Sequence, residues 1–173
     1  GEAESAYLFH HGRVERVFKR WSALRSPSLL HNYGFENMES LGAVYSRISS
    51  HIFKDWNACG KVMGLAGYGV PSARPILSGR LEDLRIDWDL LDGLVPADAW
   101  DAPAAKKRNA ELAATIQRDL ETVALDFLVR LRERTGARNL VLCGGVALNS
   151  QMNARIAAEA GFENVYVPPA PGD

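Results

Sequence analysis

One ten-residue stretch constrains the fold of this chain more than any other. Residues 140–149 read LVLCGGVALN, an apolar run that ends in two glycines and then opens a helical pattern. This order predicts a strand, a tight turn and a helix. Because Gly144 and Gly145 have no side chains, a ligand can approach their backbone, and the following helix N-terminus offers N–H groups to an anion. The stretch matches neither a Walker loop nor the dinucleotide fingerprint, so it indicates either a nucleotide site or an ordinary strand–helix corner.

Composition limits the class of protein. The 173 residues are 47% hydrophobic, which is enough to bury one core. The 20 Lys and Arg residues nearly balance the 21 Asp and Glu residues, so we expect neither nucleic acid nor an anionic membrane as a partner. No apolar run approaches the length that spans a bilayer. Cys59 and Cys143 lack the spacing of a disulfide framework or a zinc site, so we expect both to be small buried residues of a cytoplasmic protein.

The first half of the chain predicts a hairpin followed by helices. Strands at 6–9 and 14–18 flank a turn at Gly12. Residues 21–35 are rich in turn formers, so we expect an irregular segment there. Apolar residues at three- and four-residue steps predict an amphipathic helix over 36–53.

The second half predicts more helix and a βαβ unit, which together indicate an α/β fold. We expect a short helix over 61–66 and a long helix over 104–135, whereas residues 81–100 show no consistent period. Four acids in that stretch have no histidine neighbours, so a solvated face is favoured over a metal site; they are Asp83, Asp87, Asp89 and Asp92. The βαβ unit combines strands at 140–142 and 165–167 with a helix at 150–160.

Motifs along the whole chain match those of a known enzyme family. They read GEAES, LGAVYS, GKVMGLAGYG, AATIQ, LCGGVALN, VYVPP and PGD, at residues 1–5, 41–46, 60–69, 113–117, 142–149, 165–169 and 171–173. Together they closely resemble the nodulation-protein type O-carbamoyltransferases, although Gly67 stands where that family usually has proline. The resemblance implies a ribonuclease-H-like lobe of the actin, sugar-kinase and heat-shock ATPase fold, with a mixed sheet and flanking helices.

The resemblance also implies that residues 1–173 form a single partial domain, the second lobe of a nucleotide-binding domain. The upstream lobe, a His-x-x-x-His metal motif and a C-terminal domain would then come from missing parts of the same polypeptide. The histidines present here contain no pair at i and i+4 that could replace that motif; they are His10, His11, His31 and His51.

The family chemistry that the resemblance implies has two steps. Carbamoyl phosphate and ATP give carbamoyl adenylate, and a hydroxyl of a sugar or another natural product then accepts the carbamoyl group. ATP and a divalent metal, iron(II) in this family, are the implied cofactors, and a homodimer stays open. Two alternatives also stay open: a related threonylcarbamoyl or hydrogenase-maturation transferase, against which the GKVMGLA block argues, and a non-catalytic nucleotide-binding fragment.

The resemblance assigns candidate roles to residues near the C-terminal end. Gly144 and Gly145 would admit the nucleotide, and Asn149 would either hydrogen-bond it or cap the next helix. Asp173 would be the carboxylate ligand of the metal, opposite histidines outside this chain; its alternative role is an ordinary turn residue.

Further candidates lie in the first half of the chain. Lys61 would reach a phosphate or the sugar of the nucleotide, with Gly60 and Gly64 allowing close backbone approach; the alternative is a solvated surface lysine. If Lys61 is functional, its ammonium must face the same cleft as the Gly144–Gly145 turn. Tyr45 and Met63 are expected in the core. The phosphates would be bordered by Gly1, Glu2 and Ser5.

Overall fold

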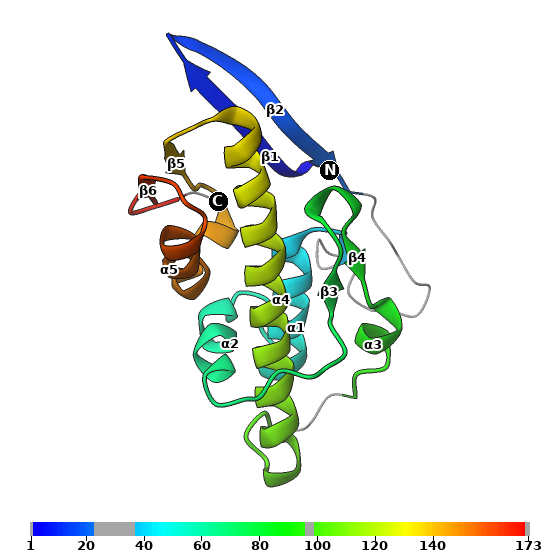
Figure 1. The fold of residues 1–173 in the computed structure, drawn as a ribbon. Helices are drawn as coiled ribbons and strands as arrows, with labels where there is room; N and C mark the ends of the chain where they lie inside the picture. Colours follow the sequence, from blue (N-terminus) through cyan, green and yellow to red (C-terminus); the bar gives the residue numbers. More distant parts are fainter. Residues whose placement is uncertain (1, 23–36, 96–98, 172–173) are drawn as a thin grey trace.

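The computed structural model describes residues 2–22, 37–95 and 99–171 (Figure 1). In chain order its elements are β1 (Glu2–His10), β2 (Arg13–Trp21), α1 (Leu41–Phe53), α2 (Cys59–Ala66), β3 (Leu77–Ser78), β4 (Arg85–Ile86), α3 (Trp88–Asp92), α4 (Pro103–Thr135), β5 (Asn139–Val141), α5 (Ser150–Glu159) and β6 (Asn164–Tyr166). Short 3-10 turns lie at Leu81–Asp83 and Gly145–Leu148. The α/β class is confirmed.

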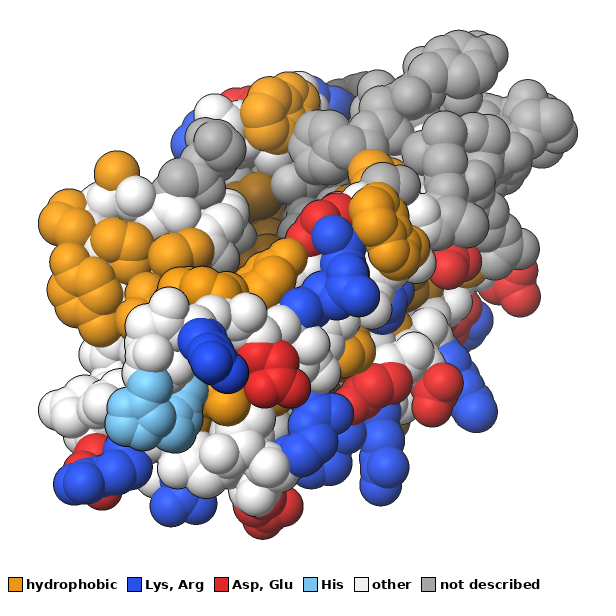
Figure 2. Space-filling view, turned by 90° about the horizontal axis from the view of Figure 1, so that it is seen from above, with side chains coloured by type: hydrophobic (Ala, Val, Ile, Leu, Met, Phe, Trp, Pro, Cys, Tyr) orange, Lys and Arg blue, Asp and Glu red, His pale blue; other side chains and the backbone are white. Residues whose placement is uncertain are grey.

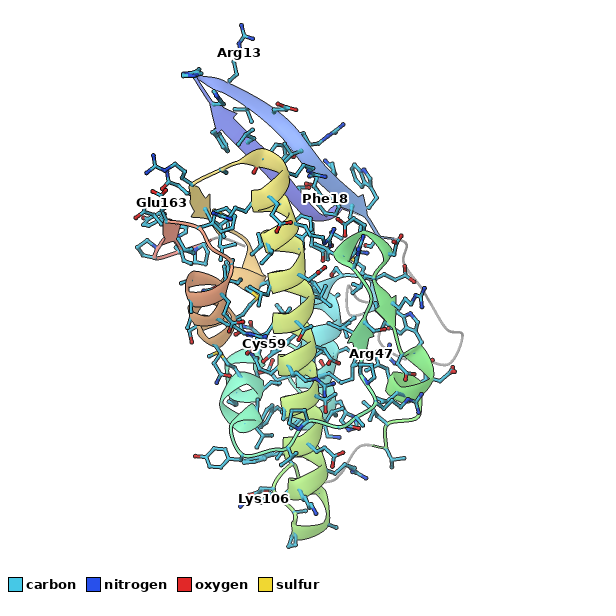
Figure 3. All side chains as sticks on the ribbon, viewed as in Figure 1. Arg13, Phe18, Arg47, Cys59, Lys106 and Glu163 are labelled. Carbon is cyan, nitrogen blue, oxygen red and sulfur yellow. The ribbon has the colours of Figure 1, made fainter. Side chains whose placement is uncertain are left out.

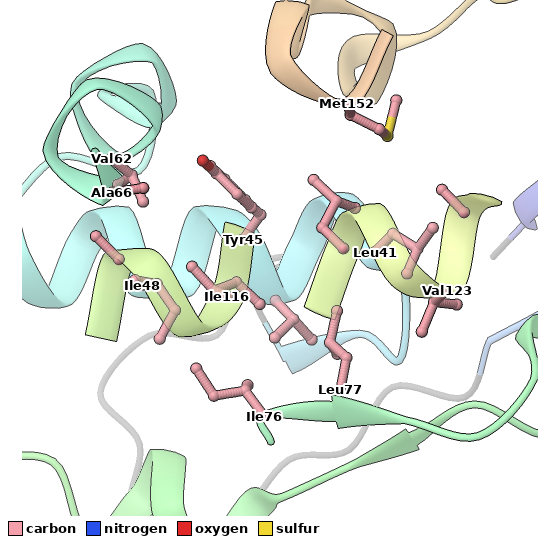
Figure 4. Packing of buried hydrophobic residues seen from close by; sticks show 14 of the residues in the cluster. Leu41, Tyr45, Ile48, Val62, Ala66, Ile76, Leu77, Ile116, Val123 and Met152 are labelled. Carbon is pink, nitrogen blue, oxygen red and sulfur yellow. The ribbon is translucent and has the colours of Figure 1, made fainter. Parts of the chain in front are cut away.

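Helix α4 runs through the middle of the molecule, and α1, α2 and α5 pack around it (Figure 1). It begins with Pro103, whose missing N–H is no loss in a first turn, and it ends at Gly136 in the left-handed conformation (φ 66°). The predicted bounds of this helix were therefore correct to within one residue. Its buried stripe includes Ile116 and Leu120, which pack in one cluster with residues of α1, α2 and α5 (Figure 4).

Helix α1 begins five residues later than its periodicity predicts. The Ser40 side chain accepts a hydrogen bond from the backbone N–H of Ala43 (3.1 Å) and fixes the first turn, so residues 37–39 lie before the helix. Of the segment expected to be irregular, Trp21 belongs to β2, and residues 23–36 lie outside the described part of the chain.

Within the described residues, the strands form three separate two-stranded sheets: β1–β2 and β3–β4 are antiparallel, and β5–β6 is parallel. The hairpin turn at Gly12 is confirmed, because both His11 (φ 46°) and Gly12 (φ 72°) have the positive φ that a tight hairpin turn favours. The expectation of one mixed sheet is wrong for the described residues, since the hairpin strands pair only with each other and not with β5 or β6.

The described residues between 81 and 95 form short elements that are held by tertiary contacts and not by a periodic pattern. The buried Asp119 carboxylate on α4 accepts hydrogen bonds from the backbone N–H groups of Ile76 (2.6 Å) and Leu77 (3.1 Å), which places β3 against α4. Asp87 caps α3 by accepting from the N–H of Leu90 (2.9 Å), and Arg74 lowers the pKa of the Asp87 carboxyl. The solvated interpretation holds for Asp83 and Asp89, which are exposed. The Asp92 carboxylate instead pairs with the buried Arg47 (2.6 Å).

At the end that carries the hairpin, the described residues form no strongly charged face. Figure 2 views that end and shows hydrophobic side chains gathered on one side, with Lys, Arg, Asp and Glu interspersed on the other. Phe9 and Val14, which lie directly opposite each other in the hairpin, are 76% and 61% exposed. None of the helices in the described ranges combines the length and the apolar content that a membrane crossing requires.

Candidate ligand cavity

A cavity of about 670 Å³ lies where five described segments of the chain meet. They are strand β1, the start of α1 with its N-cap, the start of α2 with the loop before it, α4 at Leu120, and the turn that follows β5. Cys59, labelled in Figure 3, marks the α2 side. The lining consists of Ala3, Glu4, Ser5, Ser40, Gly42, Tyr45, Ser46, Trp56, Asn57, Cys59, Gly60, Met63, Leu120, Cys143, Gly144, Gly145, Val146, Leu148 and Asn149.

The glycine turn borders this cavity, as its sequence predicts. Gly144 follows the end of β5 with φ 94° and ψ 168°, a conformation that is essentially restricted to glycine. Its N–H donates to the carbonyl of Pro171 (2.8 Å), which fixes the turn. An added Cβ at Gly144 would meet no atom within 4 Å, so the backbone faces open space. Gly145 opens a 3-10 turn, and α5 begins only at Ser150.

Asn149 is the N-cap of α5 and also lines the cavity. Its side-chain oxygen accepts from the backbone N–H of Met152 (2.9 Å), so the capping role is confirmed. The same amide exchanges two hydrogen bonds with Gln117, donating at 2.9 Å and accepting at 3.0 Å. Asn149 is only 8% exposed, and these bonds hold its side chain at the cavity wall. A hydrogen bond from Asn149 to a ligand stays a prediction.

Gln117, on α4, is a supporting residue that the sequence reasoning did not identify. Its carbonyl oxygen accepts from the Tyr45 hydroxyl (2.7 Å) as well as from Asn149, and its amide nitrogen also donates to Glu121 (2.7 Å). Burial raises the pKa of the Tyr45 hydroxyl, which keeps its proton and donates it here. Tyr45 is in the core as expected and reaches the cavity as well. The available signal was a glutamine on the buried face of a predicted helix.

The N-terminus of α1 is already capped by a carboxylate of the chain. Glu4 accepts from the backbone N–H of Leu41 (2.9 Å) with one oxygen and from Nε of Arg20 (2.8 Å) with the other. An incoming phosphate would therefore meet a negative charge at this helix end. Ser5 lines the cavity, whereas Glu2 lies outside it and pairs with Lys19 (2.6 Å), which lowers the Glu2 pKa. Gly1 lies outside the described residues.

Lys61 does not reach the cavity. Its ammonium lies 5.8 Å from the ring centre of Phe53, and the side chain is exposed. Gly60 and Met63 line the cavity because residues three apart share a helix face, whereas Lys61 and Gly64 point elsewhere. The structure therefore does not bring the Lys61 ammonium and the glycine turn into one cleft, and a ligand contact by Lys61 or Gly64 stays a prediction without geometric support.

Three side chains expected in the core lie at the cavity instead. Cys143 is exposed, so the prediction that it is buried is wrong, and Cys59 is half-buried. The Cys59 thiol donates to the carbonyl of Trp56 (3.3 Å), and burial raises its pKa, so the protonated thiol is favoured over a nucleophilic thiolate. Met63 is half-buried at the cavity and does not belong to the core, because α2 turns this face toward α5, where Ser150 lies 3.6 Å from the Met63 sulfur.

The cavity lining is nearly neutral. Of the described residues that line it, only Glu4 carries a formal charge, and Arg20 and the α1 N-terminus already compensate it. Apolar and small polar side chains make up most of the remainder. This lining suits an uncharged, partly apolar portion of a ligand better than a group of phosphates.

The residues described here do not hold a metal ion on their own. No three His, Cys, Asp or Glu side chains within residues 2–22, 37–95 and 99–171 come close enough together to bind one. Asp173, the predicted ligand, lies outside these ranges.

Comparison with known proteins gives the relationship of the chain. The sequence profile described as carbamoyltransferase N-terminus matches residues 18–173. An uncharacterized protein of Synechocystis sp. is 34% identical over 155 residues, which cover 78% of this chain and 25% of that protein. Nodulation protein NolNO of Sinorhizobium fredii is 28% identical, over 80% of this chain and 22% of its own length. Nodulation protein NolO of Bradyrhizobium diazoefficiens is 29% identical, over 80% of this chain and 27% of its own length. The matched region thus spans about a quarter of each relative.

Proposed function

The chain belongs to the family of carbamoyltransferase N-terminal domains, and from this membership we propose that it forms one nucleotide-binding lobe of an O-carbamoyltransferase. In the proposed reaction, water releases carbamate and phosphate from carbamoyl phosphate, and carbamate attacks the α-phosphorus of ATP to give carbamoyl adenylate and pyrophosphate. A hydroxyl of a sugar or another natural product then accepts the carbamoyl group, and AMP leaves. Residues 1–173 would be the second lobe of an actin and sugar-kinase type fold in a cytoplasmic enzyme. Other parts of a longer polypeptide would supply the carbamoyl-phosphate and acceptor sites.

The observation that supports this proposal most strongly is the meeting of four motifs at one cavity. Ser5, Tyr45, Gly60 and Gly144 come from four different motifs, yet all four residues line the same space. Motifs with purely local roles would not need to converge. The cavity volume of about 670 Å³ also lies within the range of small-molecule sites.

The electrostatics of the lining support one orientation of the nucleotide. The base and sugar carry no charge and fit the neutral wall, while the bare backbone at Gly144 allows close approach. The described lining offers the triphosphate no Lys, Arg or His, and Glu4 already accepts the Leu41 N–H at the α1 N-terminus, so the triphosphate should point away from α1. The cations that stabilise the developing charge on the phosphates would then come from outside the described residues.

A divalent metal, iron(II) in this proposal, would be a cofactor of the complete enzyme. The described residues do not fit a metal by themselves, so we assign no step of the reaction to it. Asp173 is the one ligand that this chain is proposed to contribute.

ATP binding by two glycine variants tests the proposed site. Gly144→Ala forces a side chain into positive φ at the cavity wall, while Gly136→Ala does the same at the end of α4, outside the cavity (φ 94° and 66°). Both variants should lose some stability from backbone strain. Isothermal titration of the full-length protein with ATP should show a loss of affinity of about tenfold or more, or about 1.4 kcal/mol, only in Gly144→Ala.

The reaction itself is tested by pyrophosphate release from ATP that depends on carbamoyl phosphate. Unchanged ATP affinity in Gly144→Ala would contradict the assigned site. ATP binding without adenylate formation under any acceptor condition would favour the non-catalytic nucleotide-binding alternative.

A further inference from the structure

We propose that the indole of Trp56 stacks on the base of the bound nucleotide and gives this cavity its preference for an aromatic ligand. The inference rests on the proposed nucleotide function and names a contact residue for it. Trp56 lies between α1 and α2, lines the cavity and is 53% exposed. A large aromatic side chain at the mouth of a ligand-sized cavity is a favourable place for a planar group to bind.

The backbone on both sides of Trp56 is fixed by hydrogen bonds. The Ser49 hydroxyl donates to the carbonyl of Asp55 (2.6 Å), and the Asp55 carboxylate accepts from the N–H of Asn57 (2.9 Å). The carbonyl of Trp56 itself accepts from the Cys59 thiol (3.3 Å). The backbone that carries the indole is therefore held at the cavity in the absence of ligand, which reduces the entropy lost when a ligand binds.

The chemistry around Trp56 favours a base over other planar groups. A second exposed apolar side chain, Leu148 (63% exposed), also lines the cavity and adds apolar surface that a ligand can bury. Among the described residues, the lining contains no Lys, Arg or His that would bind a carboxylate or a phosphate. A heterocyclic base, neutral and with an aromatic face, satisfies both conditions.

The other tryptophans provide internal controls. Trp21 is 66% exposed at the end of β2 and does not line the cavity. Trp88, the first residue of α3, is buried and does not line it either. Trp100 packs near the Phe53 ring (5.4 Å between ring centres), also outside the lining. A ligand that stacks on Trp56 should therefore change the fluorescence of one tryptophan in particular.

The experiment compares Trp56→Leu, Trp56→Phe and Trp21→Phe in the full-length protein. Adenosine, ATP and ribose 5-phosphate are titrated by calorimetry and by tryptophan fluorescence. We expect Trp56→Leu to weaken adenosine and ATP about tenfold, in line with the contribution of an aromatic side chain to base stacking. Trp56→Phe should stay within about threefold of the original affinity because it keeps an aromatic face. The ligand-induced quenching should vanish in Trp56→Phe and persist in Trp21→Phe.

The possible failures are distinguishable. If the unsubstituted protein binds neither ATP nor adenosine, the nucleotide function and the Trp56 contact both fail. If it binds them but Trp56→Leu keeps the original affinity, or quenching persists in Trp56→Phe, the Trp56 contact fails and the nucleotide function stands. Should Trp56→Leu not fold, the comparison of quenching in Trp56→Phe and Trp21→Phe decides the question. Equal affinity for ribose 5-phosphate and adenosine would also overturn the proposal.

Discussion

Gln117 and Asn149 form a reciprocal amide pair, 2.9 and 3.0 Å long, that joins the middle of α4 to the first turn of α5. Both hydrogens and both lone pairs of the Gln117 amide are used, since Tyr45 and Glu121 take the other two positions. The carboxylate of Glu121 can only accept, which fixes the orientation of the Gln117 amide. The wall of the cavity beside Gly145 is therefore held by a fully satisfied polar network.

Loss of this network should destabilise the protein far more than loss of one bond. Gln117→Met keeps the side-chain volume but leaves buried partners unsatisfied, so we expect a loss of about 2–4 kcal/mol in the free energy of unfolding by urea. Tyr45→Phe removes a single bond and should lose about 1 kcal/mol. In a double-mutant cycle, Gln117→Met and Asn149→Ala should be non-additive, and additive losses would contradict the coupling.

Asp119 should be a structural residue whose loss loosens β3 from α4. Asp119→Ala removes the acceptor for two buried N–H groups, so the unfolding free energy should fall by about 2–4 kcal/mol. Asp126, further along α4, is the matched control. Its carboxylate is exposed, and among the described residues it pairs with Arg130 alone. Asp126→Ala should lose no more than about 1 kcal/mol, and similar losses in both variants would refute the assignment.

Two nearby glycines should respond to alanine with opposite signs. A Cβ at Gly69 would lie 2.0 Å from the carbonyl oxygen of Ala110 on α4, so Gly69→Ala must displace backbone and should cost several kcal/mol. Gly67 has φ −66°, and its added Cβ would make an ordinary contact at 3.6 Å. Gly67→Ala should stabilise by about 0.4–1 kcal/mol. Thermal unfolding of both variants tests the pair, and equal effects would count against it.

His51 should make stability depend on pH in the acidic range. Burial, with Arg108, Lys54 and Arg47 nearby, lowers its pKa to about 4. In the unfolded chain the pKa is about 6.5, so the unfolded state binds more protons between these values. The contribution is complete above pH 6.5 and is lost as the pH falls toward 4.

We expect this loss to be roughly 1–3 kcal/mol in urea titrations at a series of pH values. His51→Leu should flatten the profile over that range. His10→Asn, at the exposed hairpin tip, serves as the control and should leave it unchanged. A profile that is the same with and without His51 would contradict the pKa shift.

Asp173 should affect metal content if it is a ligand. In the full-length protein, Asp173→Ala removes a negative oxygen ligand and Asp173→Asn keeps the shape without the charge, so both should retain less iron by elemental analysis. Asp101→Ala, at an exposed position, is the control. Full metal content and full transferase activity in Asp173→Ala would exclude the role.

The parts of the fold that the sequence predicted share a physical cause. The α4 helix and the glycine turn are set by local signals, a long apolar stripe and residues that permit positive φ. The short elements between residues 81 and 95 were missed because elements of two to five residues have no measurable period. Strand β4 is held by pairing with β3, which is anchored by the Asp119 carboxylate 42 residues from Leu77. The sequence did not show that Lys61 would lie outside the cavity. Lys61 follows Gly60 directly in α2, and neighbouring helix residues face different sides, so Gly60 lines the cavity and Lys61 does not. Gln117 was missed because its partners are 72 and 32 residues distant.

The same separations bear on the order in which the molecule assembles. The hydrogen bond between Tyr45 and Gln117 joins residues 72 apart in sequence and so closes a large loop. The chain must lose the conformational entropy of that loop before it gains the bond. The α4 helix, by contrast, is built from neighbours four residues apart and can form early. We expect the cavity to be completed late in folding, after α4 has docked onto α1, so ligand added during refolding should act on the last kinetic phase and leave the earlier ones unchanged.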